Sequence, residues 1–292
     1  MRRSSLLALF LFVACGGGAA TRDSSGGDSG TGTRADDGGV DENPADDGGT
    51  AADDASAVIK KDSGAPTDAG SSGDAGAYAA IENLSDNALR VALKTMVDGH
   101  TSLGYDTARD VMLGVTGTFD LTGGMLECVY TGKKVAPDGT RTPNGFNTEH
   151  TWPQSLGASN EPARSDLHHL YPVDENANTA RGNNPYADTD CSGASCSFDN
   201  GGSQLGPVSG GATVVWEVRP ARRGDVARGM FYFAVRYDKN LDAMQEAALR
   251  EWNDADPPDA LERARNDAIE GYQKNRNPFV DRPDFVAKIS DF

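Results

Sequence analysis

Three short polar blocks lie close together in the middle of the chain. Residues 147–155 read Asn-Thr-Glu-His-Thr-Trp-Pro-Gln-Ser, residues 165–172 read Ser-Asp-Leu-His-His-Leu-Tyr-Pro, and residues 176–183 read Asn-Ala-Asn-Thr-Ala-Arg-Gly-Asn. We expect two extended segments, over residues 146–152 and 166–173, and then a helix that Asp174 caps and that ends before Gly182. This order of strand, strand and helix gathers polar groups that a folded core would not select.

Glu149, His150 and Asn178 combine the groups needed for metal-assisted proton abstraction. Adjacent residues on a regular strand point to opposite faces, so Glu149 and His150 can serve one site only at a strand end or turn. The Trp-Pro pair at residues 152–153 favours such an end. Asn178 and Arg181 are three residues apart and share one helix face. A carboxylate and an amide oxygen suit a hard ion such as Mg²⁺, and an imidazole suits proton abstraction.

From about residue 78 the chain has the composition of one folded domain. Helices are predicted at residues 85–99, 105–113, 222–237, 241–252 and 257–272, and further strands at residues 125–130 and 214–218. A stretch rich in Gly and Ser over residues 188–212 is predicted to be a loop. The expected class is α+β, mostly helical around a small irregular sheet.

The N-terminus has the features of an export signal. Arg2 and Arg3 precede an apolar run over residues 6–14, which is too short to span a membrane. The run ends in Phe-Val-Ala-Cys, with Cys15 followed by three glycines. Small residues ahead of a Cys at the end of such a run resemble the signals of bacterial lipoproteins. We therefore expect residues 1–15 to be a signal peptide with a lipid-modified Cys15. The alternative is an ordinary signal peptide cut nearby, and either reading places the protein outside the cytoplasm, as a cell-envelope lipoprotein or a secreted protein.

Residues 16–77 differ from the rest of the chain in composition. They hold 13 acidic and four basic residues and 15 of the 35 glycines, and their large apolar side chains are Val40, Val58 and Ile59. Such a segment buries too little surface to offset the entropy of ordering. We expect a disordered acidic tether, because its repeated Asp-Asp-Gly-Gly lacks the ligand spacing of a calcium-binding loop.

Three cysteines follow the tether. Cys191 and Cys196 flank a loop of small residues and can close a local disulfide in an oxidising compartment. Cys128 would then be unpaired and buried in a strand. A zinc site is not expected, because no second Cys or His pair has the spacing of metal ligands around them.

The central blocks, together with two later ones, resemble the bacterial endonuclease I family. The later blocks are Gly-Asp-Val-Ala-Arg at residues 224–228 with Met-Phe-Tyr at residues 230–232, and Gln-Lys-Asn-Arg-Asn-Pro-Phe-Val-Asp at residues 273–281. The resemblance extends from about residue 85 to residue 292, so residues 78–292 are expected to be the catalytic domain. It implies a non-specific nuclease with a ββα-metal finger.

The resemblance also implies roles for the candidate residues. His150 matches the general base that activates water, and Glu149 and Asn178 match the ligands of one divalent ion, Mg²⁺ with Ca²⁺ or Mn²⁺ as alternatives. The ion would stabilise charge on the leaving 3′ oxygen, and the products would be a 5′-phosphate and a 3′-hydroxyl. Some members hold the phosphate with an arginine; Arg164 and Arg181 are both candidates, and Arg181 is favoured because it shares a face with Asn178.

Several polar residues of these blocks have structural interpretations. His168 and His169 would alternate across a strand, so that one of them faces inward as a hydrogen-bonded core residue. Asp166 is expected to orient a neighbour or cap the backbone rather than bind metal. For Arg276 and Asp281, an ion pair or a loop anchor is as good an explanation as contact with substrate.

The net charge argues against simple electrostatic capture of nucleic acid. Residues 78–292 hold 21 basic and 31 acidic residues, a net charge of −10. Nucleic-acid binding draws much of its affinity from Lys and Arg on phosphates, so the basic residues must be focused in one groove or binding must depend on the metal. Candidates for that groove are Arg219, Arg222, Arg223 and Arg228, which could equally form a solvated helix face.

The leading hypothesis is an extracytoplasmic endonuclease that hydrolyses DNA, and also RNA, through contacts with the phosphate backbone. The protein is expected to be a monomer that meets the membrane only through Cys15. A surface lipoprotein that binds nucleic acid or another polymer without cleaving it is the alternative. A metalloprotease is disfavoured because no His-Glu-x-x-His motif is present.

Overall fold

The computed structural model describes residues 74–191 and 195–292. The predicted signal peptide, Cys15 and most of the predicted tether lie outside the described residues. The last four residues of the predicted tether form a short helix, α1 (Asp74–Ala77), where the composition had predicted disorder. The buried Tyr78 holds this region in place, because its hydroxyl donates to Asp281 (2.7 Å), which also forms an ion pair with Arg276.

Helices are the main regular secondary structure and lie close to the predicted positions. In addition to α1 they are α2 (Asp86–Val97), α3 (Tyr105–Met112), α4 (Glu175–Arg181), α5 (Arg223–Arg236), α6 (Ala243–Ala255), α7 (Ala260–Gln273) and α8 (Pro278–Asp281). Helix α2 shows why the pattern was readable, because Leu89, Leu93 and Val97 recur at helical spacing and all are buried. Helix α7 begins at the side-chain cap of Asp259, two residues after the start that its Pro-Pro sequence predicted.

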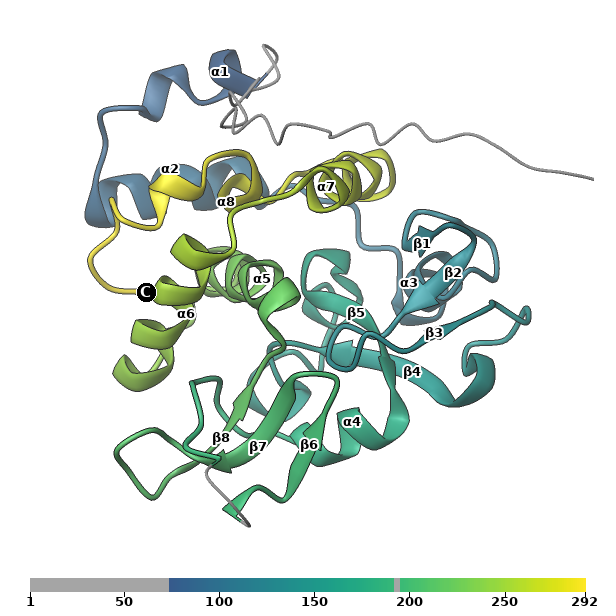
Figure 1. The fold of residues 1–292 in the computed structure, drawn as a ribbon. Helices are drawn as coiled ribbons and strands as arrows, with labels where there is room; N and C mark the ends of the chain where they lie inside the picture. Colours follow the sequence, from purple (N-terminus) through teal and green to yellow (C-terminus); the bar gives the residue numbers. More distant parts are fainter. Residues whose placement is uncertain (1–73, 192–194) are drawn as a thin grey trace, which may run out of the picture. The chain divides into compact units, whose positions relative to one another are not determined.

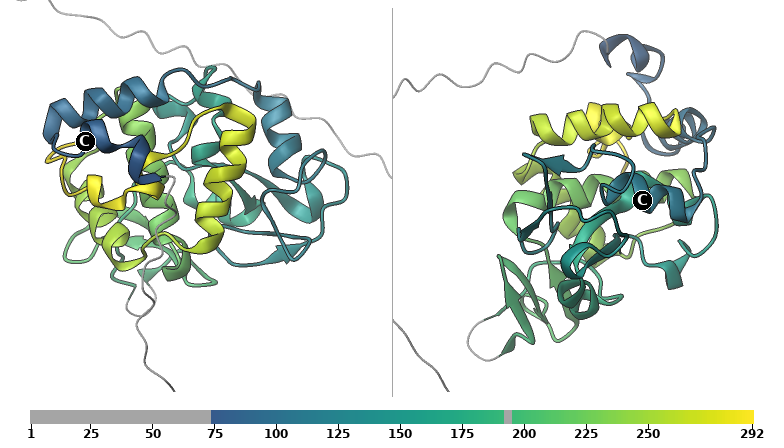
Figure 2. Two further views of the ribbon diagram at one scale, coloured as in Figure 1. Left: turned by 90° about the horizontal axis from the view of Figure 1, so that it is seen from above. Right: turned by 90° about the vertical axis from the view of Figure 1, so that its right-hand side faces the viewer.

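The strands form three small antiparallel sheets. The first contains β1 (Leu121–Thr122), β2 (Met125–Glu127) and β3 (Lys134–Val135); the second contains β4 (Phe146–His150) and β5 (Leu170–Asp174); the third contains β6 (Phe198–Asn200), β7 (Ser203–Pro207) and β8 (Val214–Glu217). Figure 1 shows these sheets on one side and the longer helices α2, α5, α6 and α7 on the other, and Figure 2 shows the same separation from above. The class is therefore α+β, as predicted.

Helix α5 is the centre of the core. Nearly all of its side chains are buried, and it packs against α2, α6, α8 and the turn that precedes β5. The ring of Phe233 on α5 stacks on Trp152, with centroids 4.8 Å apart and planes 13° apart. Because Trp152 follows β4 by two residues, this contact attaches the end of β4 to the helical core.

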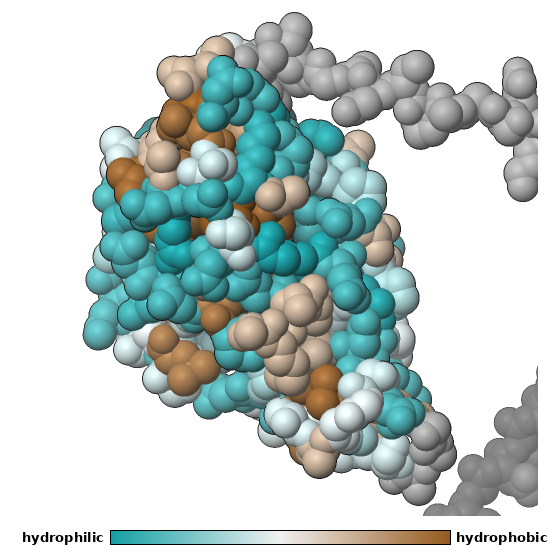
Figure 3. Space-filling model, turned by 90° about the vertical axis from the view of Figure 1, so that its left-hand side faces the viewer, coloured by the Kyte–Doolittle hydropathy of each residue, from teal (hydrophilic) through white to brown (hydrophobic). Residues whose placement is uncertain are grey.

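The surface has no large apolar face in the view of Figure 3, where hydrophobic groups form small separate patches on a mostly hydrophilic surface. Among the described residues, the exposed large hydrophobic side chains belong to different elements: Val91, Met96, Leu156, Val214 and Leu261. Single exposed apolar residues of this kind are normal for a globular domain and do not indicate a docking surface.

The predicted loop over residues 188–212 contains a hairpin that the sequence reading missed. Strands β6 and β7 are joined by Gly201 and Gly202, whose φ angles are 64° and 91°. A two-residue turn with both φ angles positive favours glycine, so the Gly-Gly pair was the available signal. A Cβ at Gly201 would also collide with the backbone of Thr131. The strands carry few apolar residues, which is why their alternation was not visible.

Three predicted strand boundaries were wrong. Residues Leu167–His169 form a 3₁₀ turn, and β5 begins only at Leu170. Strand β4 ends at His150 rather than at residue 152, and β2 ends at Glu127 rather than at residue 130. Cys128 consequently follows β2, where it is buried and unpaired, whereas Cys191 and Cys196 form the disulfide. The turn that Asp166 caps delays the start of β5, whereas β4 and β2 end two and three residues earlier than predicted.

Candidate active site

The three central blocks fold into one strand–strand–helix unit. Strands β4 and β5 pair in an antiparallel register that runs from Phe146 opposite Asp174 to His150 opposite Leu170. The Asp174 carboxylate accepts hydrogen bonds from two backbone N–H groups in the first turn of α4, so β5 leads directly into that helix. Glu149 and His150 therefore lie at the end of β4, as their expected joint use of one site requires.

A polar hollow of about 310 Å³ lies where β4 meets α4. It is lined by Thr148, Glu149, His150, Pro153, Gln154, Ser155, Asn178, Arg181, Gly182 and Asn183. The four predicted site residues, which are up to 32 positions apart in the sequence, thus line the same hollow.

Glu149 is a buried carboxylate with an unsatisfied oxygen. Its side chain is 1% exposed, and Oε1 accepts no hydrogen bond although an Nη atom of Arg181 lies 3.3 Å away. Burial raises the pKa of the Glu149 carboxyl, and the charge of Arg181 and the hydroxyls of Tyr130 and Tyr186 act in the opposite direction. A buried oxygen without a donor is costly unless a cation or a further donor reaches it.

Asn178 presents its carbonyl oxygen to the same hollow. Its Nδ2 group donates to Oδ1 of Asn147 (2.8 Å) and to the main-chain oxygen of Thr148 (3.1 Å), and these bonds fix the orientation of the amide. Within the described residues Oδ1 of Asn178 accepts no hydrogen bond, so it remains available to a cation. No group of three or more His, Cys, Asp or Glu able to hold a metal occurs in residues 74–191 and 195–292.

The donor set of Glu149 and Asn178 nevertheless fits one hard divalent ion. Mg²⁺ is commonly held by one or two protein oxygens and completes its shell with water and substrate phosphate. The Glu149 carboxylate, whose Oε1 lacks a donor, and the amide oxygen of Asn178 on the neighbouring helix are such a set.

His150 is held in the tautomer that a general base needs. Its Nε2 atom lies 3.1 Å from the main-chain oxygen of Arg164, and a carbonyl can only accept, so Nε2 carries the hydrogen and Nδ1 carries the lone pair. Burial, followed by the neighbouring His169, lowers the pKa of His150 to about 3. The imidazole is therefore neutral at neutral pH, and Nδ1 carries an unprotonated lone pair.

Arg181 binds the main chain at the site. Its Nη atoms donate to the carbonyl oxygens of His150 (3.3 Å), Thr151 (2.8 Å) and Gly182 (3.1 Å), and its guanidinium lies 4.6 Å from the ring centre of Tyr186. These contacts hold the end of β4 against the end of α4. Arg181 thus lies where it was predicted, and its contact with phosphate stays a prediction.

His168 and His169 are both buried, because the 3₁₀ turn directs both side chains into the core. Each imidazole donates through Nε2 to a main-chain carbonyl. Asp166 caps the turn through the N–H of His168 (3.1 Å) and accepts hydrogen bonds from the hydroxyls of Tyr232 (2.8 Å) and Tyr237 (2.7 Å). These bonds give Asp166 and the two histidines structural roles.

The tyrosines behind the hollow were not predicted from the sequence. Tyr130 and Tyr186 share a hydrogen bond between their hydroxyls (2.7 Å), and both are fully buried. The Tyr186 ring also makes a cation–π contact with the Arg181 guanidinium. These residues lie 56 positions apart and outside the central blocks, so no local pattern could have connected them with Glu149.

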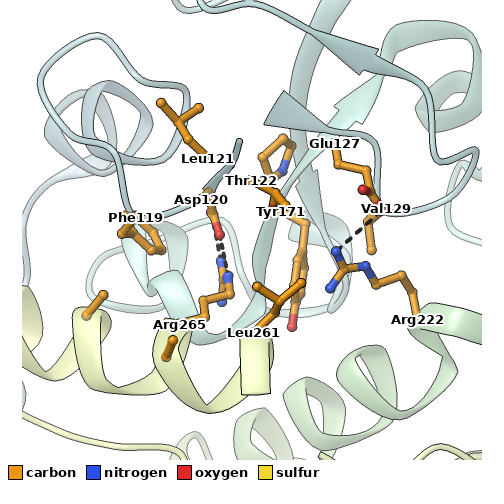
Figure 4. A pocket seen from close by; sticks show the side chains of 13 residues that line it. Phe119, Asp120, Leu121, Thr122, Glu127, Val129, Tyr171, Arg222, Leu261 and Arg265 are labelled. Carbon is orange, nitrogen blue, oxygen red and sulfur yellow. Dashed lines mark hydrogen bonds and ion pairs between the residues drawn. The ribbon is translucent and has the colours of Figure 1, made fainter. Parts of the chain in front are cut away.

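A second pocket, of about 270 Å³, opens between the β1–β2 hairpin and α7 (Figure 4). Arg265 pairs there with Asp120 (2.6 Å), and Arg222 reaches Glu127 (3.4 Å). Figure 4 shows both pairs at the pocket wall, with Tyr171 between them. Because the cations of this pocket face carboxylates, we assign no catalytic chemistry to it.

The four arginines considered for a nucleic-acid groove are engaged elsewhere. Each of them pairs with a carboxylate: Arg219 with Glu127, Arg222 with Asp225, Arg223 with Glu217, and Arg228 with Glu262. Arg228 is completely buried. They form neither a free groove nor a solvated face, since structural ion pairs neutralise them.

Comparison with known proteins agrees with this geometry. The family model described as Endonuclease I matches residues 87–284. The chain is 33% identical over 239 residues to a protein named extracellular ribonuclease from Bacillus amyloliquefaciens, and 33% identical over 236 residues to one of the same name from Bacillus subtilis (strain 168). Each alignment covers 73% of this chain and 77% of the relative. The chain therefore belongs to the endonuclease I family of nucleases.

Proposed function

We propose that this protein is a metal-dependent, sequence-non-specific endonuclease that hydrolyses phosphodiester bonds of RNA and DNA outside the cytoplasm. One observation carries the proposal: Glu149, Asn178 and His150 line one polar hollow, where the buried Oε1 of Glu149 lacks a donor and Nδ1 of His150 carries the free lone pair. A carboxylate–amide pair for a cation beside a neutral base suits metal-assisted phosphodiester hydrolysis.

Glu149 and Asn178 are the proposed ligands of one Mg²⁺ ion, with Ca²⁺ or Mn²⁺ as alternatives. When bound, such an ion polarises the phosphate and stabilises negative charge on the leaving oxygen. Because Glu149 is buried and Asn178 is fixed by its own hydrogen bonds, the two oxygens are oriented before the ion arrives.

His150 is the proposed general base. Its Nδ1 atom takes a proton from a water molecule as the water oxygen bonds to phosphorus, and the bond from phosphorus to the 3′ oxygen breaks. The leaving oxygen takes a proton from solvent, so the products are a 5′-phosphate and a 3′-hydroxyl. The hydrogen bond to the Arg164 carbonyl keeps the ring in place during this transfer.

Arg181 is proposed to stabilise the phosphate by its charge. It lines the hollow, and its burial in a medium of low polarity strengthens its field at the reacting group. Its hydrogen bonds to the carbonyls of His150 and Thr151 also position the base.

The location of the protein rests on the N-terminal sequence and on relatives that are named as extracellular enzymes. We propose export followed by lipid attachment at Cys15, so that the enzyme is anchored to the cell envelope. Radioactive palmitate supplied to a bacterial host should label the wild-type protein and leave Cys15→Ala unlabelled. An unlabelled wild-type protein would mean an ordinary secreted enzyme.

Digestion of plasmid DNA and total RNA tests the catalytic proposal. We expect Mg²⁺ to support cleavage of both substrates and EDTA to abolish it, because the two protein oxygens need a cation to act on phosphate. The ends can be read with a kinase that labels 5′-hydroxyls, which should label the products only after phosphatase treatment. Absence of cleavage with Mg²⁺, Mn²⁺ and Ca²⁺, together with retained oligonucleotide binding, would instead favour a binding lipoprotein.

A further inference from the structure

Arg164 differs from the other arginines in the described part of the chain. It is the one arginine of residues 74–191 and 195–292 whose guanidinium makes neither an ion pair nor a hydrogen bond. Its Nε atom is buried without a partner, while its terminal nitrogens stay accessible. Arg90 and Arg263, which also lack carboxylate partners, donate to main-chain carbonyls instead. An arginine without an acceptor in an acidic protein is suited to an anion from outside.

An aromatic ring and a second arginine accompany Arg164. The guanidinium carbon of Arg164 lies 4.2 Å from the ring centre of Tyr105, and that of Arg109 lies 5.3 Å from the same centre. Arg109 forms no ion pair within the described residues; it donates to the Arg141 carbonyl (3.1 Å), and its Nε atom is also buried without a partner. Two cations without carboxylate partners therefore flank one aromatic ring.

This cluster lies beside the proposed general base. The main-chain oxygen of Arg164 accepts the hydrogen bond from His150, and the Tyr105 ring centre is 5.6 Å from that of the imidazole. A pocket of about 360 Å³ opens here, lined by Gly104, Tyr105, Asp106, Thr107, Glu161 and Arg164. His150 lines the catalytic hollow and Arg164 lines this pocket, so their hydrogen bond makes the two hollows neighbours.

The negative charges of the pocket are largely engaged. Asp106 pairs with Arg141 (2.8 Å). Glu161 accepts hydrogen bonds from the hydroxyls of Ser102 (3.1 Å) and Ser165. Against these, the charges of Arg164 and Arg109 remain uncompensated by a direct partner. A guanidinium presents its N–H groups in a planar fork that matches two phosphate oxygens, and the contact with the Tyr105 ring holds the Arg164 guanidinium in place.

We propose that Arg164, supported by Tyr105 and Arg109, binds a phosphodiester next to the scissile one on the same strand. The inference rests on the proposed nuclease function and names a part of its substrate site. A flanking phosphate does not change its charge during hydrolysis, so the contact contributes equally to the ground state and the transition state. Its loss raises KM and leaves kcat nearly unchanged.

The test compares substrates with and without a flanking phosphate. A dinucleotide has one phosphodiester, and two trinucleotides add a second linkage on its 5′ or its 3′ side. In the added linkage a methylene group replaces the bridging 3′ oxygen, so the linkage keeps its negative charge but lacks the bond that the enzyme cleaves. For the wild-type enzyme, one of the two trinucleotides should have a KM about 10-fold lower than the dinucleotide. We call the ratio of the dinucleotide KM to the trinucleotide KM the gain. In Arg164→Met, and in the double variant that adds Arg109→Met, the gain should fall towards 1-fold. Arg164→Lys should retain part of it.

A matched variant and a binding measurement complete the test. Arg263→Met removes the same charge from α7, outside both hollows, and should retain the full gain. Thermal unfolding checks that each variant is folded.

Equal gains in wild type and Arg164→Met, or a loss of kcat on the dinucleotide without a change in the gain, would overturn the subsite. If the wild type cleaves nothing, the nuclease proposal fails. Oligonucleotide binding, measured by fluorescence anisotropy, then still tests the subsite. Arg164→Met must lower the binding affinity and reduce the dependence of that affinity on salt. An unchanged affinity would overturn the assignment.

Discussion

Replacing His150 by alanine is expected to leave the fold intact and to lower the rate of RNA and DNA cleavage by about 10²- to 10⁴-fold. The expected loss is large because His150 is the proposed acceptor of the water proton, and its Nδ1 atom is free to act while Nε2 is tied to the Arg164 carbonyl. Initial rates at saturating Mg²⁺ measure the effect, and circular dichroism and thermal unfolding measure the fold.

His100→Gln serves as the matched control, because His100 accepts a hydrogen bond from Arg236 (3.2 Å) and does not line the catalytic hollow. This variant should cleave at close to the wild-type rate. A His150→Ala enzyme with wild-type rates would show that another group removes the proton, and the proposed mechanism would then be wrong.

Removal of either proposed ligand should abolish the stabilisation of the protein by Mg²⁺. An ion that binds only the folded state raises the free energy of unfolding by about 2.7 kcal/mol at 100 times its Kd. We expect Asn178→Ala and Glu149→Gln to lose this increase along with nearly all cleavage. Thermal unfolding with and without Mg²⁺ measures the first effect without any reference to activity.

Two variants are needed because Glu149 is also the charge partner of Arg181 (3.3 Å), and breaking a buried pair can itself destabilise the fold by about 3–5 kcal/mol. Asn178→Ala avoids that problem, since the amide carries no charge. Glu175→Gln is the control for the loss of one negative charge, because it lies in the exposed first turn of α4 outside the hollow. If Asn178→Ala folds and is still stabilised by Mg²⁺ as strongly as wild type, Asn178 is not a ligand.

The catalytic unit was largely predictable because its signals are local. Asp174 caps α4 and Gly182 ends it, so both boundaries follow from the residues themselves. The Trp-Pro pair also indicated that β4 ends close to Glu149 and His150, although the strand stops two residues before the predicted end at residue 152. Where predictions were wrong, a local signal was weak, as in the polar strands on either side of Gly201 and Gly202, or a side-chain cap decided the result, as at Asp166.

Which arginines form ion pairs and which remain without a partner, in contrast, could not be predicted from the sequence. Arg228 reads in the sequence as one more positive charge on an amphipathic helix, yet it is buried against Glu262, which lies 34 positions away. Arg164 lies in a short polar loop and resembles any solvated residue, yet it is the arginine left without an acceptor beside His150. Charge pairing depends on which distant carboxylates the fold brings near, and no local pattern contains that information.

The sequence by itself determined the family and the α+β class, because these depend on residue type, on periodicity and on the order of neighbouring blocks. It also supplied the candidate groups for cation binding and proton transfer, which remain proposals. Only the tertiary structure decided which nitrogen of His150 is free, which oxygens lack donors, and which arginines remain available to phosphate. Those properties depend on hydrogen bonds and ion pairs between segments far apart in the chain, which form only when the core around α5 brings the segments together.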